Sequence, residues 1–444
     1  MSTTIKSVCS AWADYINALD DLPILCDVKA FRDQFICDES FRKGLNEDCL
    51  AIIKNIYPKL KINDVHFVLP RQVKEKLGKD YEPSTEALAL KSALETDKLL
   101  RRSILEMEPA HLGWREWRNN QINRYRREDQ SIRCKQITFI PFAIELTKGC
   151  SGMCSFCGLS AEELDDVDVG FESAKDIYKH LLSELHRLSG PLAVAGVLYW
   201  ATDPFDHPEY ESFSELYAEE FGLWPATTTA TGELNPQRLI SLTKSEIQKR
   251  PWGLRCSLRS HYAFEKIFKT LSPRQRACIS FIPQYKGSLS IPAIAGRAYD
   301  PLKVDQQLQD GGTIACMSGL LISIPSKEVR LITPCIAEPN HLNGYRTLAK
   351  CSFTSKKDLS EALDWLTQMM PCPNIELDTL LKITIDRSQF HLYESTKLVG
   401  LLECLYLAPA SLRMLIAKSK GRWEVDNLFK HCLELIQHGV IITL

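Results

Sequence analysis

The spacing of hydrophobic residues divides the chain into regions of different texture. Residues 1–135 carry apolar residues at helical intervals, so we expect a mainly helical N-terminal region there. Its clearest amphipathic stretch covers 86–105 and follows Pro83-Ser84-Thr85-Glu86, a good helix start. From 136 to 304, short apolar runs alternate with amphipathic stretches. The strand-like runs cover 137–146, 192–200, 224–230, 252–258 and 277–282, and the helix-like stretches between them cover 174–188, 210–220 and 237–249.

This alternation predicts parallel βαβ units. Four or five units, with a sixth strand near Ile294, indicate an α/β fold: a full or partial β/α barrel over residues 136–304. In such folds the chemistry lies at the carboxyl ends of the strands. The candidate functional residues are therefore those that follow each predicted strand.

After residue 304 the pattern changes again. Residues 313–324 and 329–333 flank Pro325-Ser326-Lys327-Glu328, which predicts a β-hairpin within a connecting region over 305–389. The last region, 390–444, reads as three short helices and a strand. These elements cover 395–407, 411–418, 425–438 and 440–444, an order that resembles a winged-helix module.

Charge and hydropathy narrow the classes of function. The chain has 54 Lys and Arg residues against 56 Asp and Glu residues, which gives no case for nucleic-acid binding. No apolar run approaches the roughly 20 residues of a membrane span, and residues 1–14 lack the apolar core of a signal peptide. We expect a soluble, cytoplasmic protein without a membrane partner. The basic stretch 101–135 is open to two interpretations, a solvated helix face or a docking surface for an acidic peptide.

Three of the 16 cysteines form a cluster. Cys150, Cys154 and Cys157 follow the first predicted strand with a C-x3-C-x2-C spacing, whereas most other cysteines are scattered singly. In a cytosolic chain, such thiols indicate a metal site. A structural zinc would need a fourth ligand, and His180 is the only nearby candidate. Iron–sulfur clusters accept thiolates readily, and three thiolates leave one iron of a [4Fe-4S] cluster open. Zinc binding and three unligated thiols remain the alternatives.

The cysteine spacing resembles the CxxxCxxC signature of the radical S-adenosylmethionine superfamily, including the aromatic residue, Phe156, before the third cysteine. This resemblance covers about residues 137–300. It implies a partial (β/α)6 barrel, a [4Fe-4S] cluster on Cys150, Cys154 and Cys157, and S-adenosylmethionine bound to the open iron. It further implies reductive cleavage to a 5′-deoxyadenosyl radical, with electrons from a reductant such as flavodoxin or ferredoxin.

The resemblance also implies cofactor contacts at the other strand ends. Asp203 lies where the superfamily places a Gly-Gly-Glu-like segment near the methionyl amine, although Asp206 is a second acidic residue there. Thr228 ends the third predicted strand, and Ser257 and Arg259 end the fourth. A serine and an arginine at that place match residues that hold the ribose hydroxyls and the carboxylate, and a planar guanidinium suits a carboxylate.

Further segments resemble proteusin-type peptide epimerases, which invert residues in ribosomally made precursor peptides. The matching segments are 147–161, 202–208 and 332–335, and the region 390–444 is similar in pattern to leader-peptide recognition modules. This resemblance implies L-to-D epimerisation of a precursor peptide that carries a leader. Backbone excision, thioether or C–C crosslink formation, and a non-catalytic iron–sulfur protein remain alternatives.

Epimerisation needs a hydrogen-atom donor on the face opposite to abstraction. A protonated thiol suits this role, because sulfur is polarizable and a low-polarity pocket keeps the thiol protonated. We expect Cys335, which follows a strand and a Thr-Pro turn, to be the donor, with Cys316 as the alternative. If the hairpin turns near Ser326, these two cysteines come close, and they would then serve equally well as ligands of a second cluster. The remaining candidates are Cys256, Cys278, Cys351 and Cys372.

Overall fold

Two units share the chain, and each is assembled from segments that are far apart in the sequence. Unit 1 comprises Met1–Glu106, Gly149–Cys154 and Val197–Ile291, and unit 2 comprises Met107–Lys148, Ser155–Gly196 and Pro292–Leu444. The computed structural model describes residues 3–78, 81–128, 138–165, 169–244, 249–289, 293–302, 316–335, 337, 341–369, 380–385, 387, 390, 399–419, 425–438 and 440–443.

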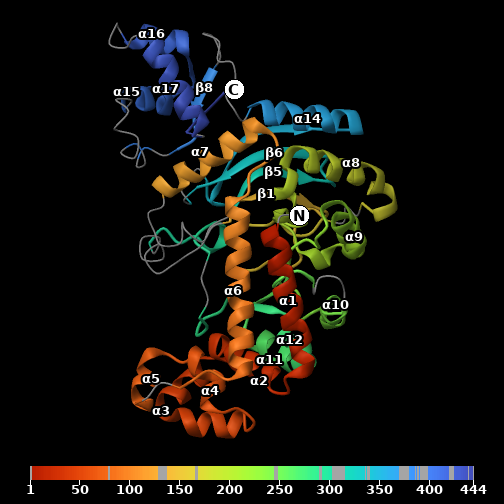
Figure 1. Cartoon of the computed structure of the whole chain (residues 1–444). Helices are drawn as coiled ribbons and strands as arrows, with labels where there is room; N and C mark the ends of the chain where they lie inside the picture. The colour runs from red at the N-terminus through yellow and green to blue at the C-terminus, as the bar shows by residue number, and fades with distance from the viewer. Residues whose placement is uncertain are drawn as a thin grey trace. The chain divides into compact units, whose positions relative to one another are not determined.

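The N-terminal part of unit 1 is helical, as the apolar spacing predicts. Two long helices, α1 (Thr3–Asp21) and α6 (Thr85–Glu106), pack side by side (Figure 1). Buried aromatic residues such as Trp12 and Phe31 fill the core between these helices and their neighbours. The remaining elements of this part are α2 (Leu25–Cys37), α3 (Glu39–Ile56), α4 (Ile62–Val65), η1 (His66–Val68) and α5 (Arg71–Leu77).

A three-stranded parallel sheet forms the rest of unit 1. Its order is β2 (Thr227–Thr229), β3 (Leu254–Leu258) and β4 (Ser280–Pro283). Both neighbouring pairs are parallel. The connecting segments are helical, as parallel pairing requires. The helical elements of this part are η4 (Pro204–Asp206), α9 (Tyr210–Phe221), α10 (Pro236–Leu242), α11 (His261–Thr270) and α12 (Pro273–Ala277).

A buried ion pair ties the N-terminal helices to this sheet. Lys29 and Asp33, one turn apart on α2, are 1% and 2% exposed, and their Nζ–Oδ2 distance is 2.5 Å. Lys29 Nζ also donates to the carbonyl of Ile279, just before β4, at 3.0 Å. The ammonium is therefore paired and hydrogen-bonded, which a buried charge requires.

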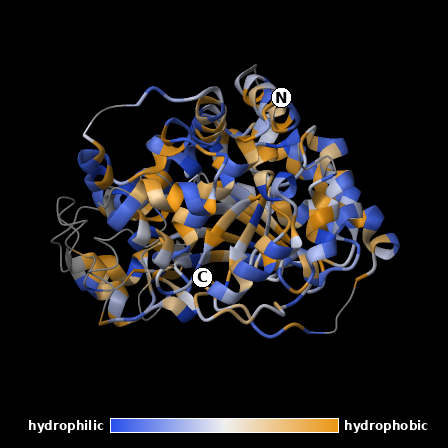
Figure 2. Ribbon diagram, turned by 90° about the horizontal axis from the view of Figure 1, so that it is seen from below, coloured by the Kyte–Doolittle hydropathy of each residue, from blue (hydrophilic) through white to orange (hydrophobic). Residues whose placement is uncertain are grey.

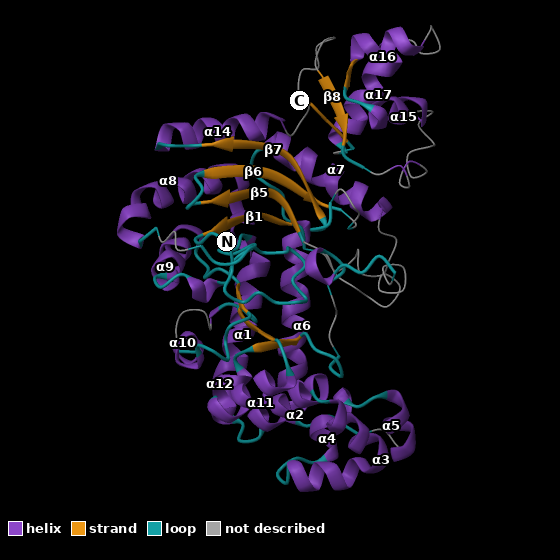
Figure 3. Ribbon diagram, turned by 180° about the vertical axis from the view of Figure 1, so that it is seen from behind, coloured by secondary structure: helices purple, strands orange, loops and turns teal. Residues whose placement is uncertain are grey.

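Unit 2 is built around a second, mixed sheet. Its order is β1 (Ile140–Glu145), β5 (Met317–Ser323), β6 (Glu328–Pro334) and β7 (Tyr345–Ser352), which lie in one layer in Figure 3. The first pair is parallel and the other two are antiparallel. All seven residues of β5 are buried, and strands in Figure 2 are mainly hydrophobic, whereas helices carry both kinds of residue. The antiparallel β5–β6 pair is the hairpin that the sequence predicts.

Helices flank this sheet. They are α7 (Leu112–Glu128), α8 (Phe171–Ser189), η3 (Gly190–Ala195) and α14 (Lys356–Met369), and η6 (Gly296–Ala298) lies in a connecting loop. Gly319 of β5 shows how closely β1 is packed, because a Cβ there would lie 1.8 Å from the carbonyl oxygen of Pro141. Only glycine fits at this position.

The C-terminal part of unit 2 has its own small sheet and core. The sheet order is β10 (Ile441–Thr443), β8 (Leu380–Ile383) and β9 (Ala410–Ser411), with antiparallel pairing. Three helices accompany it: α15 (Val399–Leu407), α16 (Leu412–Ser419) and α17 (Val425–Gln437). Leu381, Leu415 and Cys432 are among the residues of a separate buried cluster. We call residues 380–443 the C-terminal module. The helix predicted over 395–407 and the strand predicted over 440–444 include residues 395–398 and 444, which lie outside the described part of the chain.

The strand expected at 192–200 is wrong. Gly190–Ala195 forms a 3-10 helix with Pro191 in its first turn, and no strand follows over 196–200. A short apolar run does not distinguish a buried strand from a buried helical turn, and the proline fixes a φ angle that suits the helix. The helix expected over 237–249 ends at Leu242.

The fold is α/β, but the barrel expected from the sequence is not confirmed. β1 belongs to the β1–β5–β6–β7 sheet, whereas β2, β3 and β4 form a sheet of their own. Each sheet formed by the described strands is open. None of the helices in the described residues is both long and apolar enough to cross a membrane.

Candidate active site

The first two cysteines of the motif lie in a short loop of unit 1. Gly152 stands between them, and its N–H group faces Cys150 Sγ at 3.4 Å. A Cβ at Gly152 would lie 3.3 Å from Cys150 Sγ and 3.4 Å from Cys154 Sγ. The absence of a side chain at 152 therefore leaves the space beside both sulfur atoms open. Burial, reinforced by the carboxylates of Asp203 and Asp206, raises the pKa of Cys150 to about 12 in the metal-free chain.

Two side chains hold the main chain of this loop. Asp206 Oδ2 accepts the N–H of Ser151 at 2.9 Å, and its other oxygen accepts the Ser151 hydroxyl. Arg259 Nη1 donates to the carbonyl of Gly152 at 3.2 Å. The residues between Cys150 and Cys154 are thus anchored from two directions.

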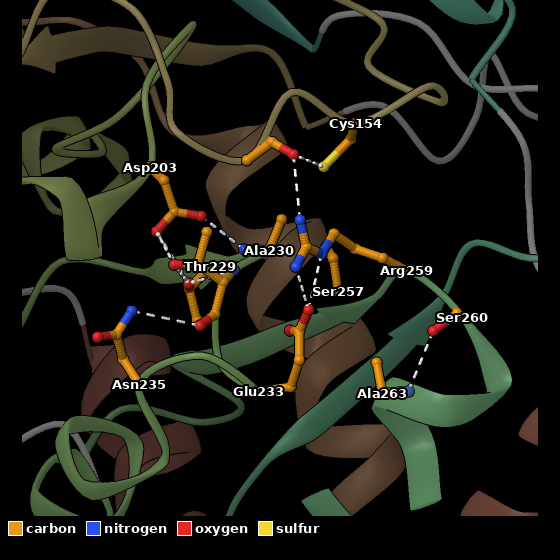
Figure 4. A network of polar contacts seen from close by, with 12 residues as sticks. Cys154, Asp203, Thr229, Ala230, Glu233, Asn235, Ser257, Arg259, Ser260 and Ala263 are labelled. Atoms are coloured by element: carbon orange, nitrogen blue, oxygen red, sulfur yellow. Dashed lines mark hydrogen bonds and ion pairs between the residues drawn. The ribbon is translucent and has the colours of Figure 1, made fainter. Parts of the chain in front are cut away.

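Arg259 is itself held by a buried carboxylate. Its Nε donates to Glu233 Oε1 at 2.8 Å, and its Nη2 donates to the same oxygen (Figure 4). Glu233 is 5% exposed, and its Oε2 has no hydrogen-bond partner in the described part of the chain. Ser257, two residues before Arg259 on β3, is half-buried, and its hydroxyl makes no hydrogen bond to the described residues.

Asp203 organises the end of β2. It is 4% exposed, and its carboxylate accepts from the N–H groups of Phe205 and Ala230 at 2.9 and 2.6 Å. The hydroxyls of Thr229 and Thr231 donate to it at 2.9 and 3.3 Å (Figure 4). Burial raises the pKa of Asp203, and these hydrogen bonds oppose the shift. Asp203 thus caps the start of η4 and fixes the loop that follows β2.

Thr228 is not part of that network. Successive residues of a strand face opposite sides, so Thr229 points to Asp203 and Thr228 points away. Its hydroxyl contacts Tyr199 Oη at 2.8 Å and accepts from Arg255 Nε at 2.9 Å. The structure therefore brings Asp203 to Thr229 and separates it from Thr228.

The third cysteine lies in a loop of unit 2 that main-chain contacts hold. The carbonyl of Cys157 accepts the N–H of Arg297 at 2.9 Å, and Arg297 Nη1 donates to the carbonyl of Ala161 at 2.7 Å. Gly296 has a φ of +60°, and a Cβ there would lie 2.5 Å from the Cys157 carbonyl oxygen. Phe156 is half-buried.

The two candidate donor cysteines flank the β5–β6 hairpin of unit 2. Cys335 directly follows β6, is fully buried, and its N–H donates to Gly344 at 3.0 Å. Cys316 directly precedes β5 and is half-buried, and its carbonyl accepts the N–H of Ile140 at 2.9 Å. The strand register pairs Gly319 with Ile332 at the end of the hairpin nearer these two cysteines.

Side chains of α7 reach the end of β6 next to Cys335. Arg124 is fully buried, and its Nη2 donates to the carbonyl of Pro334 at 2.5 Å and to the Thr333 hydroxyl at 3.1 Å. The Thr333 hydroxyl in turn donates to Gln121 at 3.1 Å. The main chain that carries Cys335 is therefore fixed on both sides.

Sequence reasoning missed Glu233 and the role of Asp206. Glu233 follows the end of β2, and a carboxylate after a parallel strand is a position from which a candidate site residue can be predicted. Asp206 is an obvious acidic residue in the sequence, but its contact with Ser151 joins positions 55 residues apart and has no local signature.

Among the described residues, no three or more His, Cys, Asp or Glu side chains form a preassembled metal-binding group. The assignment of a metal to Cys150, Cys154 and Cys157 therefore depends on their spacing and on the open loop around Gly152. Cys372, another donor candidate, lies outside the described residues.

The chain matches a known protein over most of its length. The chain is similar to a protein of Sinorhizobium fredii described as uncharacterized protein y4wI, with 26% identity over 425 residues. The match covers 88% of this chain and 80% of that protein. No family model matches the chain, and no solved structure matches it.

Proposed function

We propose that the protein is a radical S-adenosylmethionine enzyme that converts L-residues of a ribosomally made precursor peptide into D-residues. The observation that carries the proposal is the C-x3-C-x2-C spacing of Cys150, Cys154 and Cys157 in the loop that follows β1. Three thiols this close in the sequence suit a [4Fe-4S] cluster with one open iron.

The loop around the first two thiols fits such a cluster. Gly152 leaves room beside both sulfur atoms, and any larger residue would crowd them. When bound, the cluster and S-adenosylmethionine supply a 5′-deoxyadenosyl radical that abstracts a hydrogen atom from Cα. The chain's part is to hold these groups, orient the peptide and return a hydrogen atom.

The side chains beside the loop retain hydrogen-bonding capacity for S-adenosylmethionine. A guanidinium has five N–H donors, and Arg259 makes three of the recorded bonds, so donors remain for a carboxylate. Asp203 Oδ2 accepts a single N–H and retains a position for an ammonium group. The open hydroxyl of Ser257 suits a ribose hydroxyl. Phe156 completes the proposed contacts, whereas Thr228 faces away from Asp203 and its hydroxyl is engaged by Tyr199 and Arg255.

We assign hydrogen return to Cys335, with Cys316 as the alternative. The abstracted hydrogen leaves in 5′-deoxyadenosine, and the Cα radical takes a hydrogen atom from the S–H bond on the opposite face. One electron and one proton then restore the thiol, which requires a reductant such as flavodoxin or ferredoxin. The complete burial of Cys335 supports this assignment, because a thiol shielded from solvent is less readily oxidised.

The same proposal covers the capture of the substrate, the barrel fold and the location of the protein in the cell. The C-terminal module, with its own sheet, helices and core, is proposed to bind the leader of the precursor. The parallel pairing of β2, β3 and β4 supports a partial (β/α)6 barrel. A cytoplasmic location is proposed because the site needs reduced thiols.

Deuterated water provides the decisive test. A candidate precursor co-expressed with the enzyme should gain one deuteron for each inverted residue, because the returned hydrogen comes from an exchangeable thiol. In ordinary water the peptide mass should not change. A mass change in ordinary water would replace epimerisation by another radical modification. Failure of the anaerobically reconstituted, reduced protein to form 5′-deoxyadenosine from S-adenosylmethionine would reject the radical chemistry itself.

A further inference from the structure

The loop between Cys150 and Cys154 is held by side chains that come from two other segments of unit 1. Asp206 takes both donors of Ser151, its N–H and its hydroxyl. Arg259 takes the next carbonyl, that of Gly152, at 3.2 Å. Two consecutive residues of the three between these cysteines are thus fixed by three hydrogen bonds.

These contacts act on the main chain between two proposed cluster ligands. Ser151 is exposed, and a loop that contains glycine has many accessible conformations when it is not held. Each bond from Asp206 or Arg259 has a charged partner, and such bonds are shorter and stronger than neutral ones. The contacts therefore restrict the directions in which the thiols of Cys150 and Cys154 point.

The second contact has a support of its own. Arg259 would be free to swing away from Gly152 if Glu233 did not bind it through Oε1. Glu233 is nine-tenths buried and carries no hydrogen bond at Oε2 within the described residues. Burying a carboxylate with one unused oxygen is costly, and the pairing with Arg259 offsets that cost. The pair holds the donor toward the cysteine loop.

We infer that Asp206 and the Glu233–Arg259 pair are positioning residues that set the Cys150–Cys154 loop in the conformation that binds the iron–sulfur cluster. The inference rests on the proposed function, because it assumes that these thiols ligate a cluster. It adds roles for Asp206 and Glu233 that do not require contact with S-adenosylmethionine. Outer contacts of this kind typically change metal affinity by roughly 10- to 100-fold.

The chain offers a matched control in the same segment. Arg238 binds the carbonyls of Phe205 and His207, at 3.0 and 2.8 Å, and the carboxylate of Glu211. It therefore supports the loop that carries Asp206 but makes no recorded contact with Ser151 or Gly152. Arg238→Lys weakens the support of that loop, whereas Asp206→Asn weakens the contact between the loop and Ser151.

The test uses the full-length chain, reconstituted anaerobically with iron and sulfide. After reduction, we measure iron and sulfide per chain, the rate of iron transfer to a ferrous chelator, and the electron paramagnetic resonance spectrum with and without S-adenosylmethionine. Asp206→Asn should release iron roughly tenfold faster than the unchanged protein or more, and Glu233→Gln should release it severalfold faster. Arg238→Lys should stay within about twofold, and all three should melt at similar temperatures.

A double-mutant cycle completes the test. If Asp206 acts through Ser151, the effects of Asp206→Asn and Ser151→Ala on iron release should be less than additive. Unchanged iron release in Asp206→Asn, full additivity, or an equal effect of Arg238→Lys would overturn the inference while the radical chemistry stands. Failure of the unchanged protein to bind iron and sulfide would instead reject the proposed function, and this inference with it.

Discussion

The parallel sheet of unit 1 and the mixed sheet of unit 2 differ in the side chains at their ends. At the end of the parallel sheet of unit 1, carboxylates, hydroxyls and a guanidinium hold the loops near Cys150 and Cys154. At the end of β6 in unit 2, Cys335 is fully buried on a main chain that Arg124 and Gly344 fix. The first setting suits the binding of polar and charged groups, and the second shields a thiol from solvent. The proposed radical epimerisation needs both, and the first two variants below each affect one of them.

The largest effect is expected from replacing Cys150, Cys154 and Cys157 together with Ala. Without thiolates no cluster forms, so the visible absorbance and all turnover should be lost. Iron and sulfide assays after anaerobic reconstitution provide the measurement. Replacement of Cys49, Cys404 and Cys432, which lie singly elsewhere, is the control. Tight binding of zinc, without iron and sulfide, by the intact motif would contradict the assignment.

The next variant affects the buried thiol at the end of β6. Cys335→Ala should still form 5′-deoxyadenosine but should lose deuterated D-product, because abstraction needs the cluster and return needs the donor. Mass spectrometry of peptide made in deuterated water measures both. Cys316→Ala is the matched comparison across the hairpin. If Cys335→Ala makes D-residues at the normal rate, the donor assignment moves to Cys316.

The two sheet ends also show which features of the structure could be predicted from the sequence. The cysteine spacing, the helices and most strands were predictable, because they depend on local pattern. The separation of β1 from β2–β4 was not, since β1 pairs with β5, whose residues come much later in the chain. The anchoring of Ser151 by Asp206 and the choice of Thr229 over Thr228 depend on the packing of distant loops and on strand alternation, which residue type alone does not reveal.

A third variant tests the support of the parallel sheet. Asp33→Ala leaves the buried ammonium of Lys29 unpaired beside the Ile279 carbonyl, and breaking a buried pair typically costs about 3–5 kcal/mol of unfolding free energy. Chemical denaturation measures the change. A loss of less than about 1 kcal/mol of unfolding free energy, as for an exposed pair, would mean that the pair is not buried in solution.

The exposed pair of Asp20 and Arg274 is the control for that variant. Asp20 lies 2.6 Å from Arg274 Nε, and the hydrogen bond lowers the pKa of its carboxyl group. Asp20→Ala should therefore cost less than about 1 kcal/mol at pH 7. A lowered pKa means that this contribution is present above the usual carboxyl pKa of about 4 and disappears as the pH falls below it. The difference between the two proteins should vanish in acid.

The smallest effect on the chemistry is expected from removing the C-terminal module. β8 pairs with both β9 and β10, so a cut near residue 390 would leave β8 without partners, and the deletion should begin before Leu380. The truncated enzyme should cleave S-adenosylmethionine at nearly the normal rate but bind the precursor about tenfold more weakly or worse, a change of 1.4 kcal/mol or more. Fluorescence anisotropy with a labelled precursor measures binding. Equal binding by the folded truncated chain would give the module another role.

The interleaving of the two units has a consequence for how the protein is made. β1 lies in the first half of the chain, and its parallel partner β5 follows more than a third of the chain later. At roughly 5–20 residues per second, a ribosome needs on the order of ten seconds or more to deliver that partner. During this interval the apolar strand has an unpaired edge, which is a template for wrong pairing. Folding of this chain during its synthesis should therefore depend on chaperones, and growth at a lower temperature should raise the yield of folded protein.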